Sequence, residues 1–276
     1  MVVCVASMKG GVGKSTLSAM LARFIAEHRE TPVTVVDLDP QRGATVLLLG
    51  AEHAKRHAGP GVYEILESEQ AHIPSSELLA QALKTSPYDA RIRVVPSDAG
   101  LARLRGPETP RGLLALALQD APLAANETVI VDTSPEVTFC EMGIEAADMV
   151  LVPITMSHQS GIPTLNTLQA ILHADKAIGG LVPTLVGSAK WQGERVDSWR
   201  ASLMESMLLK GRGIDVLPAM LFSHSIPSGR WRWGKIPKGC LGVLDAVYAK
   251  LFGEHALTEA EVVDEVEEEA LVEGVV

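Results

Sequence analysis

The sequence has few of the residues that build disulfide frameworks, metal clusters or membrane spans. Its 276 residues include three cysteines, at positions 4, 140 and 240, and they form no Cys-x-x-Cys pair or Cys/His cluster. Isolated thiols of this kind are typical of free cysteines in a reducing compartment, and they do not indicate an iron–sulfur or zinc site. No apolar run approaches the roughly 20 residues that a membrane-spanning helix needs. These absences argue against redox-cluster, zinc and integral membrane proteins.

Basic residues are missing from the end of the chain. Residues 254–276 hold nine acidic residues and no Lys or Arg, whereas the rest of the chain holds 25 acidic and 24 basic residues. The net charge of −10 therefore comes from this tail and does not argue against nucleic-acid binding by the remainder. Aromatic residues are scarce at 4%, but the hydrophobic content of 47% is enough for a sizeable core. We expect one domain over residues 1–253, followed by an acidic tail over 254–276 that is flexible or helical.

What the sequence does contain is a glycine-rich turn between a predicted strand and a predicted helix. Residues 2–6 form an apolar run typical of a buried strand, and apolar residues after position 16 recur at three- and four-residue spacing, as on one face of a helix. Glycines between them allow backbone N–H groups to surround an anion, and a helix N-terminus adds partial positive charge. The pattern predicts a phosphate-binding loop at residues 7–16, with Lys14 on the β- and γ-phosphates and the Ser15 hydroxyl on Mg²⁺.

The loop departs from the usual phosphate loop in one respect. Met8 stands five residues before Gly13, where the usual pattern has glycine, and a second lysine, Lys9, follows it. The run Lys-Gly-Gly-Val-Gly-Lys-Ser over residues 9–15 resembles the deviant Walker A motif of the ParA/MinD family of P-loop ATPases. The resemblance implies that Lys9 reaches across a nucleotide-sandwich homodimer to the partner's phosphates, and that Lys9 and Lys14 both act in catalysis. It places ATP on the loop residues Lys9, Gly10, Gly11, Val12, Gly13, Lys14, Ser15 and Thr16.

Two acids follow the next predicted strand. Residues 33–38 predict a buried strand that delivers Asp37 and then Asp39 at its carboxyl end, the edge of an open α/β sheet that faces ligands. The Asp-x-Asp-Pro-Gln pattern at this point and the Gly-Ala-Thr at residues 43–45 resemble the same family. The resemblance implies that Asp39 orients or activates the attacking water and that Asp37 supports the water shell of Mg²⁺. An acceptor on this loop is well placed for such a water.

A later strand, predicted at residues 128–132, ends in Asp132. An apolar run that ends in Asp is the Walker B pattern, and it predicts that Asp132 holds Mg²⁺ through its water shell. The Thr-Ser-Pro that follows resembles the switch II segment of the family, commonly Asp-x-Pro-Pro, with Ser134 at the position of the first proline. That departure bears on the rigidity of the switch and not on metal binding. The predicted Mg²⁺ residues are thus Ser15, Asp37 and Asp132.

Strand-like and helix-like segments alternate along the chain. Further strands are expected at 91–96, 181–186 and 215–218, and a helix is expected to start at 101–105, followed by an apolar run at 113–118 that covers the sheet. The family resemblance implies another strand at 146–153 and helices at 61–66 and 162–174. This alternation, without an internal repeat, predicts an α/β fold with a single doubly wound, mostly parallel sheet flanked by helices.

Basic residues gather in the stretch 186–240, where nine Lys and Arg face four acids. Residues 229–235, Gly-Arg-Trp-Arg-Trp-Gly-Lys, interleave bases with aromatics; phosphates favour the bases, and flat aromatics can stack on nucleobases. ParA-type proteins bind DNA non-specifically through a basic surface in this region, so the resemblance implies DNA contacts here. A solvated basic face with two packing tryptophans is the alternative. The candidate DNA contacts are Lys190, Arg195, Arg200, Arg230, Arg232 and Lys235.

These features lead to an interpretation as a Mg²⁺-dependent ATP hydrolase of the ParA type that partitions plasmid or chromosomal DNA. The resemblance implies an ATP-dependent dimer that binds DNA and hydrolyses ATP slowly until a ParB-like centromere-binding protein stimulates it. The acidic tail would be repelled by anionic lipid, which argues against the membrane-binding branch of the family. A MinD-like or other ParA-like positioning ATPase with a non-DNA cargo is the alternative. Because the phosphate loop begins almost at once, we expect no signal peptide and a cytoplasmic, nucleoid-associated protein.

Overall fold

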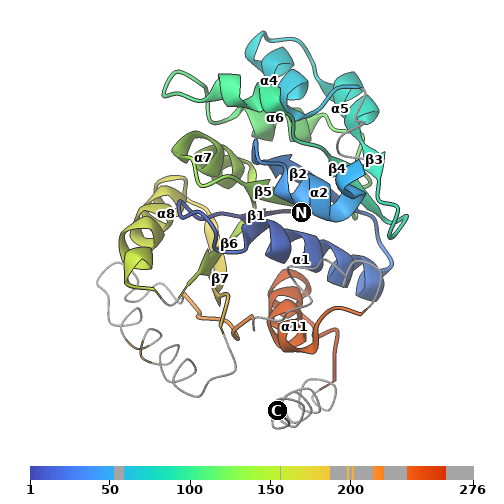
Figure 1. Ribbon diagram of the computed structural model, residues 1–276. Coiled ribbons are helices and arrows are strands. Elements are labelled where there is room, and N and C mark those ends of the chain that lie inside the picture. Colours follow the sequence, from blue (N-terminus) through green and yellow to red (C-terminus); the bar gives the residue numbers. More distant parts are fainter. Residues whose placement is uncertain are drawn as a thin grey trace.

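The computed structural model describes residues 1–52, 59–155, 157–186, 198, 201, 214–220 and 235–258. Within these residues the chain forms a seven-stranded sheet with helices on both faces (Figure 1). The strands follow the order β3-β4-β2-β5-β1-β6-β7, and all neighbours are parallel except the β3–β4 pair. The predicted single, mostly parallel sheet is therefore confirmed. The strands are β1 Val2–Val5, β2 Val33–Leu38, β3 Lys84–Thr85, β4 Ile92–Val95, β5 Thr128–Thr133, β6 Met149–Ile154 and β7 Ala177–Pro183.

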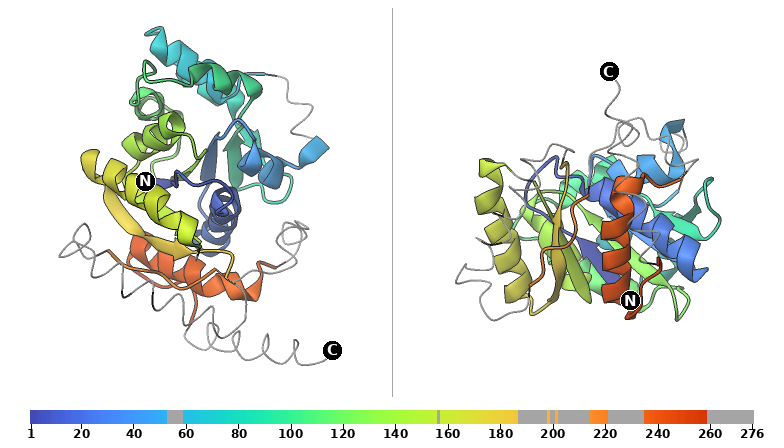
Figure 2. Two further views of the ribbon diagram at one scale, coloured as in Figure 1. Left: turned by 60° about the vertical axis from the view of Figure 1, so that its left-hand side comes forward. Right: turned by 90° about the horizontal axis from the view of Figure 1, so that it is seen from below.

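The described helices cover both faces of the sheet, as two further views show (Figure 2). One face carries α1 (Lys14–Arg29), α2 (Gly43–Leu49) and α11 (Lys238–Phe252). The opposite face carries α4 (Val62–Gln70), α5 (Ser76–Ala82), α6 (Leu113–Gln119), α7 (Val137–Ala146) and α8 (Gly161–His173). Two short 3₁₀ helices, η1 (Ala99–Leu104) and η2 (His158–Ser160), lie in the connections.

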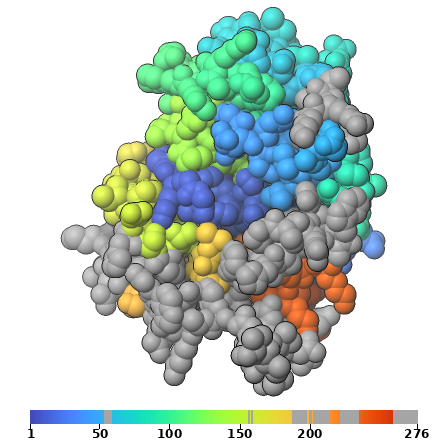
Figure 3. All heavy atoms as spheres, viewed as in Figure 1, coloured from blue at the N-terminus to red at the C-terminus, as the bar shows by residue number. Residues whose placement is uncertain are grey.

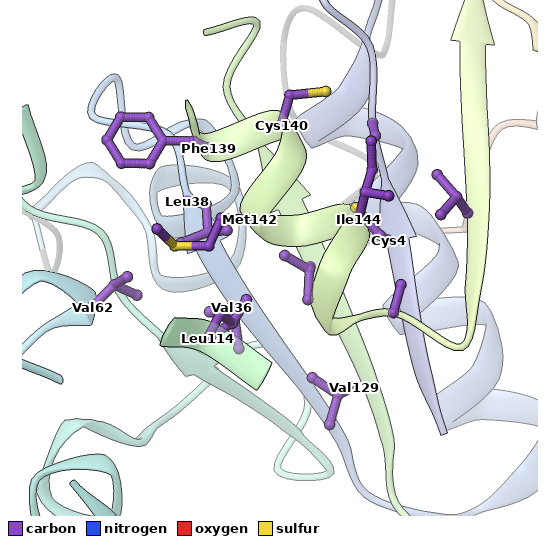
Figure 4. Close-up of a cluster of buried hydrophobic side chains, with 14 of the residues drawn as sticks. Cys4, Val36, Leu38, Val62, Leu114, Val129, Phe139, Cys140, Met142 and Ile144 are labelled. Carbon is purple, nitrogen blue, oxygen red and sulfur yellow. The ribbon is translucent and has the colours of Figure 1, made fainter. Parts of the chain in front are cut away.

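Burial on both faces explains the continuous apolar runs of the central strands. Every residue of β2 and β5 is buried, as expected for parallel strands covered by helices on each side. On the face under α7, Val36 of β2 and Val129 of β5 belong to the same hydrophobic cluster as Phe139 and Met142 of α7 (Figure 4). These strands are the rigid frame on which the polar loops at their carboxyl ends are held.

The strand predicted at 181–186 is displaced in the structure, where β7 starts at Ala177 and ends at Pro183. The sequence conceals its first half, because Gly179 and Gly180 are poor strand formers. Both glycines are required by close packing: a Cβ atom would lie 2.8 Å from Met149 at the first and 2.7 Å from Leu217 at the second. Tertiary packing against β6 and the chain near Leu217 thus overrides local propensity.

Two other element predictions were wrong in detail. The strand expected at 215–218 is an isolated parallel bridge, in which Val216 pairs with Leu181. The helix expected to start at 101–105 is the 3₁₀ helix η1, which begins at Ala99 because Asp98 caps it by accepting from the backbone N–H of Gly100 at 2.6 Å. The antiparallel edge strand β3 had no signal in the sequence, because it is only two residues long.

The start of the acidic tail folds back onto α11. Asp245 accepts hydrogen bonds from His255 Nδ1 at 2.6 Å and from the backbone N–H groups of Ala256 and Leu257 at 2.7 and 3.0 Å. Residues 259–276 lie outside the described residues, so the division at 253/254 stays a prediction. Among the described residues, no helix combines the length and apolar character needed to cross a bilayer.

Candidate functional site

The carboxyl ends of the central strands meet at one edge of the sheet. The register places Val5 of β1 beside Asp132 of β5, and Asp132 beside Asp37 of β2. The loops after these three strands therefore lie next to one another, at the edge where open α/β sheets bind ligands. The space-filling view shows the blue N-terminal part of the chain at the surface beside the yellow-green part that contains α8 (Figure 3).

The glycine-rich loop joins β1 to α1 through left-handed backbone conformations. Gly11 and Gly13 have φ angles of 72° and 80°, a region that favours glycine. α1 begins at Lys14 without a side-chain cap, so the N–H groups of its first turn have no side-chain acceptor among the described residues. Thr184 supports the loop, because its Oγ1 donates to the carbonyl of Val12 at 2.7 Å. Open N–H groups at a helix start, preceded by such glycines, suit a phosphate.

Lys14 lies across this loop. Its Nζ donates to the carbonyl oxygens of Ser7 at 3.1 Å and Lys9 at 3.0 Å. Burial lowers the pKa of Lys14, and the nearby charge of Asp132 opposes that shift. A phosphate is a charged acceptor and forms a stronger hydrogen bond than a neutral carbonyl does. Lys14 is thus placed to exchange the two carbonyls for a phosphate bound in the loop.

Lys9, the second lysine of the loop, contacts the connection between β6 and α8. Its Nζ donates to the hydroxyls of Thr155 at 2.9 Å, Ser157 at 2.6 Å and Ser160 at 2.6 Å. All three partners belong to the same chain as Lys9. The role predicted for Lys9 across a dimer stays a prediction.

Asp132 is fully buried at the end of β5. Its Oδ1 accepts from Ser18 Oγ at 3.0 Å, and the nearby Ser15 hydroxyl, like Ser18, lowers the pKa of this carboxyl. Oδ2 is buried, and among the described residues no donor reaches it. Burial raises the pKa of Asp132, and the neighbouring Asp37 raises it further. An unsatisfied carboxylate oxygen beside a serine hydroxyl fits Mg²⁺, which prefers oxygen ligands.

Asp37 has both carboxylate oxygens occupied. Oδ1 accepts from the backbone N–H of Asp39 at 3.0 Å, and Oδ2 accepts from the N–H and the hydroxyl of Thr45, each at 2.7 Å. Burial raises the pKa of Asp37, and the bonds from Thr45 oppose that shift. Asp37 therefore fastens to the sheet the loop that carries Asp39, whose Oδ1 accepts from the N–H of Gln41 at 2.8 Å. The Mg²⁺ contact of Asp37 and the catalytic role of Asp39 stay predictions.

The loop after β2 also packs directly against the phosphate loop. A Cβ atom on Gly43, the first residue of α2, would lie 2.4 Å from Ser15 Oγ and 2.9 Å from Ser15 Cβ. A side chain at this position would displace the serine that is predicted to bind Mg²⁺. The structure thus joins the predicted phosphate loop and the loop of Asp39 through one close contact.

Sequence reasoning missed the hydroxyl groups that support these side chains. Ser18 lies three residues after Ser15 on the same face of α1, a spacing that could have indicated it. Thr184 and Thr155 carry no local signal, since Thr155 is 146 residues from Lys9 and Thr184 is 172 residues from Val12 in the sequence. Only the folding of β6 and β7 beside β1 brings these two residues to the site.

The predicted DNA contacts are almost all outside the described residues. This holds for Lys190, Arg195, Arg200, Arg230 and Arg232. Lys235 is described and exposed, three residues before α11 begins. The DNA-binding surface therefore stays a prediction.

The glycine-rich loop, the buried Asp132 at the end of β5 and the mostly parallel sheet define a P-loop nucleotide-binding protein. A family model described as an AAA domain matches residues 1–177. The chain is 26% identical over 229 residues to Maintenance of carboxysome distribution protein A from Synechococcus elongatus, covering 80% of this chain and 86% of the relative. It is 28% identical over 198 residues to Chromosome partitioning protein ParA from Myxococcus xanthus, covering 68% and 65%. The chain belongs to this AAA domain family and is a P-loop ATPase of the ParA/MinD type.

Solved structures share the fold. An ATP complex of McdA from Cyanothece superposes with a TM-score of 0.70 at 21% identity, covering 94% of this chain and 98% of the other. Cobyrinic acid a,c-diamide synthase from Mycobacterium smegmatis, with bound ADP and magnesium, gives a TM-score of 0.69 at 24% identity, with the same two coverages. At this level of identity the likeness concerns the fold alone.

Proposed function

We propose that the chain is a Mg²⁺-dependent ATP hydrolase that positions DNA in the manner of ParA partition proteins. The main support for Mg²⁺-dependent ATP hydrolysis is the Oδ2 atom of Asp132, which is buried, lies near Ser15 and has no donor among the described residues. Lys14 and the open start of α1 lie on the same loop as Ser15. A phosphate and a divalent cation would satisfy these groups together, as Mg²⁺-nucleotide does in P-loop proteins.

In this mechanism each side chain has a separate task. Lys14 binds the β- and γ-phosphates, and Ser15 and Asp132 hold Mg²⁺, directly or through its water shell. When bound, Mg²⁺ neutralises charge that develops on the phosphates. Asp37 holds the loop after β2 in place, so that Asp39 can accept a hydrogen bond from the attacking water.

The dimer of this proposal is supported by an uncharged helix at the same edge of the sheet. α8 contains no Asp, Glu, Lys or Arg. Its first turns expose Ile162 by 74% and Leu165 by 39%, and Val137 at the start of the adjacent α7 is 51% exposed. Apolar side chains exposed together on a helix edge suit a surface that another protein covers. We assign it to a second copy of this chain, joined when ATP is bound.

For the cargo we propose DNA, bound non-specifically by the basic stretch 186–240 of the ATP-bound dimer and released after a ParB-like partner stimulates hydrolysis. The excess of Lys and Arg there supports phosphate binding. Such a protein would be cytoplasmic and nucleoid-associated. The name of the cyanobacterial relative favours a second candidate, a ParA-like ATPase that distributes a non-DNA cargo.

Binding to non-specific duplex DNA tests the proposal. It is measured without nucleotide, with ADP and with ATP, each with Mg²⁺ and at two salt concentrations. We expect binding only with ATP and weaker binding at higher salt, because phosphate contacts release counterions. Lys9→Ala should abolish DNA binding because the dimer no longer forms. The double variant Arg230→Ala/Arg232→Ala should abolish DNA binding because two basic contacts to DNA are lost.

A matched control is Lys84→Ala/Arg103→Ala, which removes two positive charges outside the basic stretch and should bind as the wild type does. Loss of binding only in the Lys9 variant would keep the nucleotide switch and move the DNA surface elsewhere. Intact ATP hydrolysis without DNA binding in any state would refute DNA partition and favour the non-DNA cargo.

A further inference from the structure

Lys9 is held inside its own subunit by three hydroxyl groups, those of Thr155, Ser157 and Ser160, which we call the hydroxyl seat. The lysine Nζ lies 2.9, 2.6 and 2.6 Å from these oxygens. An ammonium group has three N–H donors, so each donor of Lys9 has an acceptor in the seat. The position of this side chain is therefore specified by the fold and is not that of a freely moving surface lysine.

The seat is itself a connected network. The hydroxyl of Ser160 lies 2.8 Å from that of Thr155 and 2.9 Å from that of Ser157. Ser160 is fully buried, and the other two residues are half-buried. A hydroxyl that accepts from the ammonium can still donate its own hydrogen to a neighbouring hydroxyl. Hydrogen bonds among the three hydroxyls thus help to hold their oxygens in place around Lys9.

All three acceptors in the seat are neutral. The seat satisfies the hydrogen bonds of Lys9 but does not neutralise its positive charge. A phosphate oxygen is a stronger acceptor for an ammonium group than a hydroxyl is. A carboxylate in the same place would hold Lys9 more firmly against such competition. A neutral seat therefore holds the lysine reversibly.

The seat is connected to the nucleotide site through the backbone of the loop. The carbonyl of Lys9 accepts from Lys14 Nζ at 3.0 Å, and the N–H of Met8 donates to Thr167 of α8 at 3.0 Å. A phosphate that draws Lys14 away removes the hydrogen bond from the Lys9 carbonyl. The attachment of Met8 to α8 is not affected by that change. Nucleotide binding would thus remove one of the two backbone hydrogen bonds of Lys9, whose N–H also donates to Ser7 Oγ at 3.4 Å, while the preceding residue stays attached to α8.

We propose that the hydroxyl seat is a positioning site that retains Lys9 in its own subunit before dimerisation and so sets the ATP concentration at which the dimer forms. This inference rests on the proposed function, because it takes the partner's phosphates as the competing acceptor for Lys9. In this proposal Thr155, Ser157 and Ser160 act through their hydrogen bonds to Lys9.

The variant Ser157→Ala tests the seat, because it removes one acceptor from a half-buried position. The variant should be less stable than the wild type without nucleotide, yet should dimerise more readily. The nucleotide-free protein should melt at a lower temperature, and the concentration of the ATP analogue AMP-PNP for half-maximal dimerisation should fall about threefold to tenfold. Dimerisation is measured by sedimentation velocity with Mg²⁺ present. A merely structural role for Ser157 would weaken folding without promoting the dimer.

Two matched variants serve as controls. Ser157→Thr keeps the hydroxyl and should restore wild-type behaviour. Ser68→Ala removes a hydroxyl of similar exposure that donates to the carbonyl of Ile73 at 2.9 Å, and it should leave dimerisation unchanged. In the Lys9→Met background, Ser157→Ala should no longer lower the melting temperature of the nucleotide-free protein, because the coupled partner is absent.

The possible results distinguish a failure of the hydroxyl-seat proposal from a failure of the proposed ATP-dependent dimer. A wild type that dimerises with AMP-PNP, beside a Ser157→Ala variant that needs the same concentration or more, overturns the seat alone. An equal loss of stability from Ser157→Ala in the wild-type and Lys9→Met backgrounds also overturns it. A wild type and variant that both stay monomeric overturn the proposed dimer and the seat together.

Discussion

At the scale of single residues, two adjacent buried aspartates differ in what surrounds them. Asp37 accepts three hydrogen bonds from its own loop, whereas Asp132 keeps one oxygen without a donor among the described residues. Burial raises the pKa of both carboxyls. A carboxyl with a raised folded pKa gives its full contribution to the free energy of unfolding below the ordinary value of about 4, and this contribution is lost as pH rises through the folded pKa. Burial raises the pKa of Asp37 to about 6 and that of Asp132 to about 8, so the metal-free protein loses this contribution as pH rises through these two values.

The neutral substitutions of these two residues should act in opposite directions. In the presence of EDTA, we expect Asp132→Asn to raise the melting temperature at pH 8 by about 2–4 °C, with a smaller gain at pH 5. Asp37→Asn should lower the free energy of unfolding by about 1–3 kcal/mol, because backbone donors lose an acceptor. Thermal melting across this pH range measures both effects.

Thermal melting with Mg²⁺-ATP is the control for the Asp132→Asn prediction. It should stabilise the wild type by mass action and should not stabilise Asp132→Asn, which lacks the charged ligand. Destabilisation of the metal-free protein by Asp132→Asn, or undiminished stabilisation of that variant by Mg²⁺-ATP, would contradict the assignment of Asp132 to the metal.

At the scale of elements, α8 combines two contacts with the loop edge of the sheet. Its Thr167 accepts from the N–H of Met8, and the segment before it provides the hydroxyls that hold Lys9. Its outer side exposes Ile162 and Leu165. A helix that touches the phosphate loop on one side and exposes apolar residues on the other is placed to link nucleotide binding to association of two chains.

We expect Ile162→Glu to raise the AMP-PNP concentration needed for dimerisation by at least about tenfold. The reason is that a charge would have to be desolvated in the interface. Because Ile162 is 74% exposed, the melting temperature of the nucleotide-free monomer should stay the same. Sedimentation velocity and thermal melting measure the two quantities.

Ile73→Glu is the matched control, since Ile73 is 58% exposed in the segment between α4 and α5. It should dimerise as the wild type does. If Ile162→Glu also dimerises normally, the outer side of α8 does not belong to the interface between two copies.

At the scale of the whole molecule, helices cover both faces of the sheet, and all three cysteines are buried as a result. Cys4 on β1, Cys140 on α7 and Cys240 on α11 are all buried. Burial raises the pKa of Cys140 to about 12, so its reactive thiolate is scarce at neutral pH.

The native protein should therefore show no rapidly reacting thiol. With Ellman's reagent at pH 8, we expect no fast colour change before denaturation and three equivalents of thiol in guanidinium chloride, because unfolding exposes all three cysteines. Reaction of one equivalent within the mixing time in the native state would contradict this packing. A variant such as Ser68→Cys, at a half-exposed position, verifies that an accessible thiol is detected.

The sequence by itself determined the parts of the site whose chemistry is local. The glycine-rich loop, the buried strands that deliver Asp37 and Asp132, and the single parallel sheet follow from short-range patterns of glycine, charge and apolar periodicity. Such patterns do not predict a residue whose identity is determined by packing against a part of the chain that is distant in sequence. Gly179 and Gly180 conceal half of β7, and only their packing against Met149 and Leu217 explains them.

Only the tertiary structure decided which side chains of the site have hydrogen-bond partners and which carboxylate oxygen has none among the described residues. Ser18 donates to one oxygen of Asp132, and the other oxygen is left without a donor among the described residues. The residues of the hydroxyl seat lie 146 to 151 positions after Lys9, and they reach that lysine because β6 pairs with β1. Hydrogen bonds between residues so far apart depend on strand order and register. Neither is encoded in any local stretch of the chain.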